Sequence, residues 1–158
     1  MTQEKKHADP WIQLIEDHQD VSEWFSNLDK LPNIKDKQEI WNHLSEIEAM
    51  FDRNLMLHFQ FEEDHIFSRV LAHTTDLKLV KYVLSLQKDH GIITERITSF
   101  WKIVENNAET KSPDSSARLI LLFMDIQDEI LDHAHKEDQK LFPYVKENLE
   151  LFENYDKE

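Results

Sequence analysis

Cysteine is absent from this chain of 158 residues. Disulfide bridges, thiolate metal ligands, iron–sulfur clusters and cysteine nucleophiles are therefore excluded. One glycine and four prolines are too few for a turn-rich β fold, and they suit long, uninterrupted helices. We therefore predict an all-α protein with a single domain over residues 1–158 and a core over about residues 10–152.

Long apolar runs and a positive surface are also lacking. No stretch approaches the roughly 20 apolar residues that a membrane span requires, and residues 1–7 lack the apolar centre of a signal peptide. The formal net charge of -14 disfavours nucleic acids and anionic membranes as partners. We therefore expect a cytoplasmic protein that binds neither nucleic acid nor membrane.

What the chain does contain is apolar residues that recur at the helical period in four segments. The first segment starts at Asp9-Pro10, a capping residue followed by proline, and ends before Pro32. The second runs from about residue 35 to 73, the third starts near Asp76, and the fourth follows a polar connector over residues 106–116. We expect Pro143 to kink or end the fourth helix. A short C-terminal extension over residues 144–155 should pack back on the bundle.

A histidine followed four residues later by a glutamate occurs twice in the chain, and a single histidine precedes each pair. The pairs begin 75 residues apart, and the single histidines lie 72 residues apart. The repeated pattern consists of His18, His58 and Glu62 in the first half and of His90, His133 and Glu137 in the second half. Two halves of one helical architecture therefore offer the same set of side chains.

All six of these residues lie on helix stripes that are otherwise apolar. Residues four apart share one side of a helix, so each pair can converge on one inward location. A buried, unpaired carboxylate costs on the order of several kcal/mol, and metal ions would offset that cost for all six groups together. Imidazole and carboxylate ligands favour iron, with manganese second and zinc third. Six ligands for two ions leave open positions, as in the di-iron centres of helical bundles.

This ligand pattern, with Leu141-Phe142-Pro143 after the second pair, resembles the hemerythrin-like, histidine-histidine-glutamate (HHE) cation-binding domains over about residues 11–152. The ligand set is most similar to that of the di-iron domain of iron-centre repair proteins. The resemblance implies an antiparallel up-down four-helix bundle. It also implies two irons joined by an oxo or hydroxo bridge, with Glu62 and Glu137 as bridging ligands.

Three positions beside the pattern have more than one interpretation. Oxygen-carrying hemerythrins have a fifth histidine at the position of Thr94 and an aspartate ligand at the position of Asp138. We prefer Glu137 to Asp138 because a residue five positions after His133 points about 140° away on an ideal helix. Thr94 and His65 are candidates for contacts with the ligands. The acidic clusters around the ligands are predicted to face solvent.

We predict a non-haem di-iron protein that reacts with O2, nitric oxide or peroxide in a redox or stress-response role, with an electron donor that the sequence does not identify. Thr94 in place of a fifth histidine frees a coordination position, which favours reactivity. Three alternatives stay open: reversible O2 binding or sensing, iron storage or donation, and a bundle whose histidine–glutamate pairs bind no metal.

Overall fold

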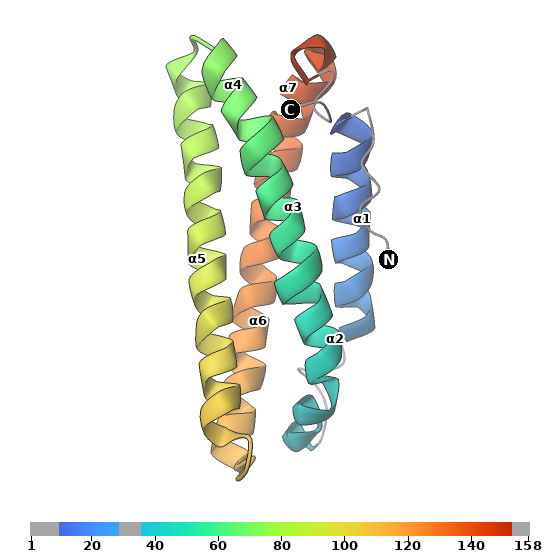
Figure 1. The fold of residues 1–158 in the computed structure, drawn as a ribbon, viewed down its shortest axis with the longest axis vertical. Helices are drawn as coiled ribbons and strands as arrows, with labels where there is room; N and C mark the ends of the chain where they lie inside the picture. The colour runs from blue at the N-terminus through green and yellow to red at the C-terminus, as the bar shows by residue number, and fades with distance from the viewer. Residues whose placement is uncertain (1–9, 29–35, 153–158) are drawn as a thin grey trace.

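The structure is a computed structural model that describes residues 10–28 and 36–152, and it is almost entirely helical there (Figure 1). The first helix is α1 (Pro10–Leu28). The second is a continuous helical segment made of η2 (Lys37–His43), α2 (Leu44–Glu48), η3 (Ala49–Leu55), α3 (Met56–Phe61), η4 (Glu62–Phe67) and α4 (Ser68–His73). The third is α5 (Leu77–Asn107), and the fourth comprises α6 (Pro113–Lys136), η5 (Glu137–Leu141) and α7 (Phe142–Glu147), followed by η6 (Leu149–Phe152).

The four long segments alternate in direction along the bundle axis. In the view of Figure 1, α1 and α5 descend, whereas α2–α4 and α6–α7 ascend. Residues 74–76 join α4 to α5 and residues 108–112 join α5 to α6, and such short connections place antiparallel helices side by side. The predicted all-α four-helix bundle is therefore confirmed. No helix in the described ranges combines the length and the apolar character that a membrane crossing requires.

Capping side chains fix the starts of α5 and α6. Asp76 accepts a hydrogen bond from the backbone N–H of Lys78 at 2.9 Å, and Ser112 accepts one from the N–H of Ser115 at 3.1 Å. Both satisfy donors that the first turn of a helix leaves free. The predicted start near Asp76 is confirmed, and the polar connector is shorter than predicted. The start of α1 at Pro10 also agrees with the prediction, while Asp9 lies outside the described residues.

Turns of π helix lie at both glutamates of the repeated pattern. The π turn η4 begins at Glu62 and the π turn η5 begins at Glu137. Such turns are rare in proteins, and those that occur are often found at functional sites. Pro143 follows η5 in the first turn of α7, and the chain stays helical to Glu147. The helix therefore does not end at this proline, and the kink stays a prediction. Pro143 stands in the first turn of α7, after the π turn, where its missing N–H is tolerated.

Two apolar clusters fill the interior of the bundle, one on each side of the buried histidines and glutamates of the repeated pattern. The larger contains Phe51, Phe100 and Phe123, and the smaller contains Phe67 and Phe152, all of them fully buried. Each such side chain contributes about 1.5–3 kcal/mol when it leaves water. Because Phe152 is buried in η6, the predicted return of the C-terminal extension is confirmed as far as residue 152; residues 153–155 lie outside the described part.

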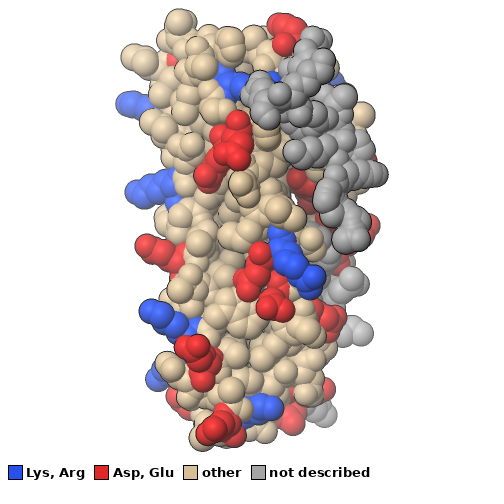
Figure 2. Space-filling model, in the orientation of Figure 1, with Lys and Arg blue, Asp and Glu red and all other residues tan. Residues whose placement is uncertain are grey.

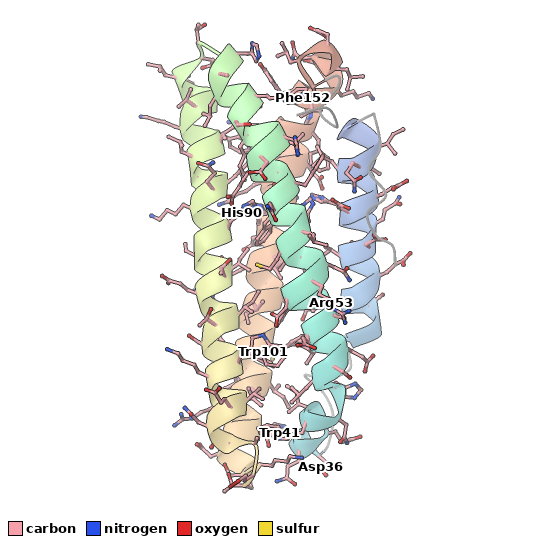
Figure 3. The ribbon with its side chains drawn as sticks, viewed as in Figure 1. Asp36, Trp41, Arg53, His90, Trp101 and Phe152 are labelled. Atoms are coloured by element: carbon pink, nitrogen blue, oxygen red, sulfur yellow. The ribbon has the colours of Figure 1, made fainter. Side chains whose placement is uncertain are left out.

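On each of the four helical segments, residues of the repeated pattern lie between side chains of the larger cluster and side chains of the smaller cluster. On α5, Leu86 belongs to the smaller cluster and Ile93 to the larger one, with His90 between them. Figure 3 shows His90 in the interior, nearer to Phe152 than to Trp41 at the opposite end. On the face in Figure 2, acidic and basic side chains are interspersed, so the net charge of -14 forms no single acidic patch there.

Candidate metal centre

All six side chains of the predicted ligand set meet in the interior. They form two overlapping groups, His18, His58, Glu62 and Glu137, and Glu62, His90, His133 and Glu137. Within each group the possible ligand atoms lie within 4.8 Å of one another. Both glutamates belong to both groups, which is the arrangement that two metal ions sharing two carboxylates would need.

Each of the four helical segments contributes to the centre, and nearly all of the contributed side chains are buried. Glu62 and Glu137 are 0% exposed, and His58, His90 and His133 are also buried. The His18 side chain is the most accessible of the six, at 15%. The second and fourth segments supply a histidine and a glutamate each, because residues four apart share a side of the helix.

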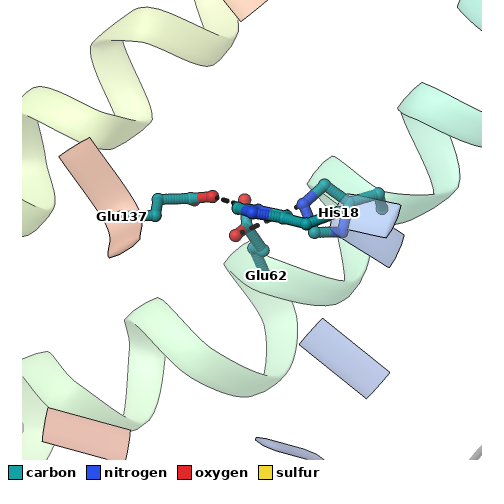
Figure 4. Close-up of side chains that lie close together, drawn as sticks. His18, Glu62 and Glu137 are labelled. Atoms are coloured by element: carbon teal, nitrogen blue, oxygen red, sulfur yellow. Dashed lines mark hydrogen bonds and ion pairs between the residues drawn. The ribbon is translucent and has the colours of Figure 1, made fainter. Parts of the chain in front are cut away.

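The Nε2 atoms of the histidines point into the centre. The Nε2 of His18 lies 2.9 Å from Oε1 of Glu137, and Figure 4 shows these two side chains facing each other with Glu62 beside them. The Nε2 of His90 lies 3.0 Å from Oε1 of Glu62 and 3.0 Å from Nε2 of His133. The ligand atoms of helices that are far apart in sequence are therefore in direct contact.

Two buried carboxylate oxygens lack a hydrogen bond among the residues that the structure describes. They are Oε2 of Glu62 and Oε2 of Glu137, and each has a histidine Nε2 nearby, at 3.4 Å from His58 and at 3.1 Å from His133. Buried acceptors without donors are costly, and lone pairs that converge on one point are satisfied by a cation. The donor set of four imidazoles and two carboxylates therefore fits metal ions.

The pKa values show how the carboxylates and histidines polarise each other. Burial alone would lower the pKa of His133, but Glu137 and Asp89 outweigh it and raise this pKa to about 12. Burial is likewise outweighed at His58, where Glu62 raises the pKa well above its usual value. Burial would raise the pKa of Glu62, yet His58 and His133 hold it well below its usual range. The centre therefore attracts positive charge, and a metal ion would compete with these protons.

Four further carboxylates, which we call the outer carboxylates, contact the opposite ring nitrogen of the histidines. The distances to Nδ1 are 2.8 Å for Asp17 to His58, 2.7 Å for Glu63 to His90, 3.2 Å for Asp89 to His133, and 3.5 Å for Asp138 to His18. Glu63 and Asp138 are exposed, as predicted for the acidic clusters, but both also contact a histidine of the centre. The prediction of a solvent-facing side chain is wrong for Asp17, which is 19% exposed. The signal that could have found the outer carboxylates is their position: each is adjacent in sequence to a member of the ligand set.

The remaining sequence candidates lie around the centre rather than in it. Asp138 belongs to neither group and its side chain is 58% exposed, so the geometry favours Glu137 over Asp138. His65 also belongs to neither group, and its ring lies 5.6 Å from that of Phe61. Thr94 is exposed, and its hydroxyl donates to the backbone carbonyl of His90 at 2.7 Å.

Two surface hollows reach histidines of the centre. A groove of about 1040 Å³ beside α1 and α7 is lined by His18, Asp138 and Phe142. A smaller hollow of about 420 Å³ between α3 and α5 is lined by His90 and Thr94. Aromatic rings cover the inner face of this second hollow, since Phe59 stacks on the His90 ring with 3.8 Å between the ring centroids. A histidine of the centre therefore lies in the wall of each hollow, on two different sides of the bundle.

The four-helix bundle and its histidine–glutamate centre together define a cation-binding helical protein. The family model of the hemerythrin HHE cation binding domain matches residues 9–145. The chain belongs to this family, which confirms the resemblance seen in the sequence. Comparisons with curated proteins and with solved structures found no match.

Proposed function

We propose that this protein binds two iron ions and reacts with O2, nitric oxide or peroxide. The ligands are His18, His58, Glu62, His90, His133 and Glu137, with both glutamates shared between the ions. One observation carries the proposal: the six side chains form two overlapping groups that have both glutamates in common. A single ion needs only one such group, whereas two ions use all six residues.

Iron is the cation that this donor set suits best. Four imidazoles with two carboxylates exclude the soft ions, and manganese and zinc are the next candidates. When bound, iron supplies one-electron redox chemistry towards small oxidants. The chain itself holds the ions at fixed positions and limits water, because Phe59 and Phe67 cover the His90 ring. The partners are small molecules and an electron donor of unknown identity.

The hollow beside His90 is the proposed entrance for small molecules. Gly91 lies in its wall, and a Cβ built at Gly91 meets no atom within 4 Å. The backbone at Gly91 therefore accepts a side chain, and we expect a large one to narrow the hollow. Ser22 lies in the groove beside His18 and offers a matched position for the same change on the other side of the centre.

Iron donation is a second candidate function, and one observation favours it. His18 is the least buried of the six residues and opens on the larger groove. A donor protein would lose iron readily to an apo-protein acceptor, whereas a redox protein would keep both ions through repeated oxidation and reduction.

Anaerobic loading with Fe²⁺ followed by stopped-flow mixing with O2, nitric oxide or peroxide tests the proposal. We expect about two irons per chain and a rapid change in the near-ultraviolet spectrum. Gly91→Trp should slow that change, and Ser22→Trp should leave its rate unaltered. A loaded protein whose spectrum is indifferent to all three oxidants would overturn the redox proposal. If removal of O2 fully restored the spectrum recorded before O2 was added, the protein would be an O2 carrier instead.

A further inference from the structure

The outer carboxylates Asp17, Glu63, Asp89 and Asp138 form a closed ring around the centre. Each comes from one helical segment and contacts a histidine of the next: first to second, second to third, third to fourth, and fourth back to first. Three links are hydrogen bonds of 2.7–3.2 Å, and the link from Asp138 to His18 is longer, at 3.5 Å. All four segments of the bundle are therefore tied together around the ligand layer.

The ring follows from helix geometry. Successive residues of an α-helix are rotated by about 100°, so the neighbour of an inward residue points sideways towards the adjacent helix. Asp17 and Asp89 directly precede His18 and His90, and Glu63 and Asp138 directly follow Glu62 and Glu137. Every segment therefore supplies one inward histidine and one sideways carboxylate, and the second and fourth segments each add an inward glutamate.

We propose that the outer carboxylates are positioning residues that also make the centre favour the oxidised pair of irons over the reduced pair. The inference rests on the proposed function, because it assumes that the six ligands hold two irons. A carboxylate that accepts the Nδ1–H of a histidine leaves the Nε2 lone pair free and fixes its direction. His58, His90 and His133 have such a partner, so these three are set to ligate through Nε2. The Nδ1 of His18 lies 3.5 Å from Asp138, a longer contact on the same side of the ring.

The preference for the oxidised pair follows from charge. Two shared glutamates and four outer carboxylates place six carboxylates around the two ions, and Coulomb attraction grows with the charge of the ions. Two ferric ions carry a total charge of +6 and two ferrous ions carry +4. The ring therefore stabilises the oxidised pair more, which lowers the reduction potential of the centre.

The outer carboxylates differ in how far neighbouring side chains offset their negative charge. Asp89 also accepts a hydrogen bond from Nζ of Lys136 at 2.9 Å, and this ammonium group offsets part of its charge. Among the described residues, Glu63 forms an ion pair with no lysine or arginine, and its carboxylate contacts Nδ1 of His90 at 2.7 Å. Neutralising Glu63 should therefore change the potential more than neutralising Asp89.

Reduction potentials of iron-loaded variants test the inference. Glu63→Gln and Asp89→Asn keep an oxygen that can accept the Nδ1–H but remove the charge, so orientation is preserved and the electrostatic effect is isolated. Asp64→Asn is the matched control, because Asp64 is an exposed neighbour of Glu63 whose side chain makes no contact with the histidines of the centre. Iron per chain is measured on each protein before a spectroelectrochemical titration.

We expect about two irons per chain in each variant. In Glu63→Gln, the equilibrium constant that favours the oxidised over the reduced irons should be about tenfold smaller per electron than in the parent. This change corresponds to a midpoint potential that is higher by about 59 mV. Asp89→Asn should shift the potential in the same direction by less, and Asp64→Asn should match the parent. Glu63→Leu removes the acceptor as well and should lower metal affinity by about 10- to 100-fold.

Equal potentials for Glu63→Gln, Asp89→Asn and Asp64→Asn in proteins that retain two irons would overturn the inference and leave the proposed function intact. A parent protein that takes up no iron would instead overturn the proposed function, and the inference with it. If Glu63→Gln does not fold, Asp89→Asn against Asp64→Asn decides the same question.

Discussion

The folding stability of metal-stripped protein should depend steeply on pH because of His133. The pKa of this residue is raised to about 12 in the folded chain, against 6.5 for an ordinary histidine. A raised folded pKa contributes stability that is fully present below about pH 6.5 and is lost as the pH rises towards about 12. Between pH 7 and pH 9, the loss of this contribution from His133 should therefore lower the free energy of unfolding by about 2–3 kcal/mol.

The assay is urea unfolding, followed by circular dichroism, in the presence of a chelator at pH 7, 8 and 9. His133→Gln removes the titrating group, so the free energy of unfolding of this variant should fall by about 2–3 kcal/mol less than that of the parent over this range. His135→Gln is the matched control, because His135 is an exposed histidine two residues away on the same helix, and it should follow the parent. Parallel pH profiles for the parent and His133→Gln would refute the account of charge at the centre.

Three further predictions concern the helices, the core and the metal. Gly91→Ala should raise the free energy of unfolding by about 0.5–1 kcal/mol, since Gly91 is an exposed residue within α5 with free space around it; a lower melting temperature would contradict this. Phe123→Ala should cost about 3–5 kcal/mol in urea unfolding, because Phe123 is fully buried. Iron affinity, measured by competition with a chelator, should weaken as the pH falls from 7.5 to 5.5, because protons compete for the histidines; constant affinity would speak against imidazole ligands.

The helices could be predicted from the sequence because their signals are local. The 3.6-residue period of the apolar residues located all four segments, and Asp76 caps α5 where the prediction began it. The π turns were not predicted, because no residue type marks a change from α- to π-helical hydrogen bonding. The same gap bears on Pro143, which does not end the helix as one of its two predicted outcomes required but stands at the start of α7, directly after η5.

The ligand set could be predicted because the same pattern of histidines and a glutamate occurs in both halves of the sequence. Spacing identified the pairs His58/Glu62 and His133/Glu137, and the structure brings them together with His18 and His90. The contacts of the outer carboxylates with the histidines were not predicted, since a residue adjacent to an inward ligand leaves the apolar stripe. Whether such a side chain contacts solvent or the neighbouring helix depends on the distance between the two helices. That distance cannot be read from the residue pattern along a single helix.

Iron stoichiometry in ligand variants tests the central claim most directly, namely that two ions share Glu62 and Glu137. The measurement is iron per chain after anaerobic loading with Fe²⁺ and removal of loosely bound metal. The parent should retain about two irons. His90→Ala, which removes a ligand from only one group, should retain about one, and Glu62→Ala, which removes a ligand from both, should retain fewer than one. Two irons retained by Glu62→Ala, or none bound by the parent, would contradict the shared centre.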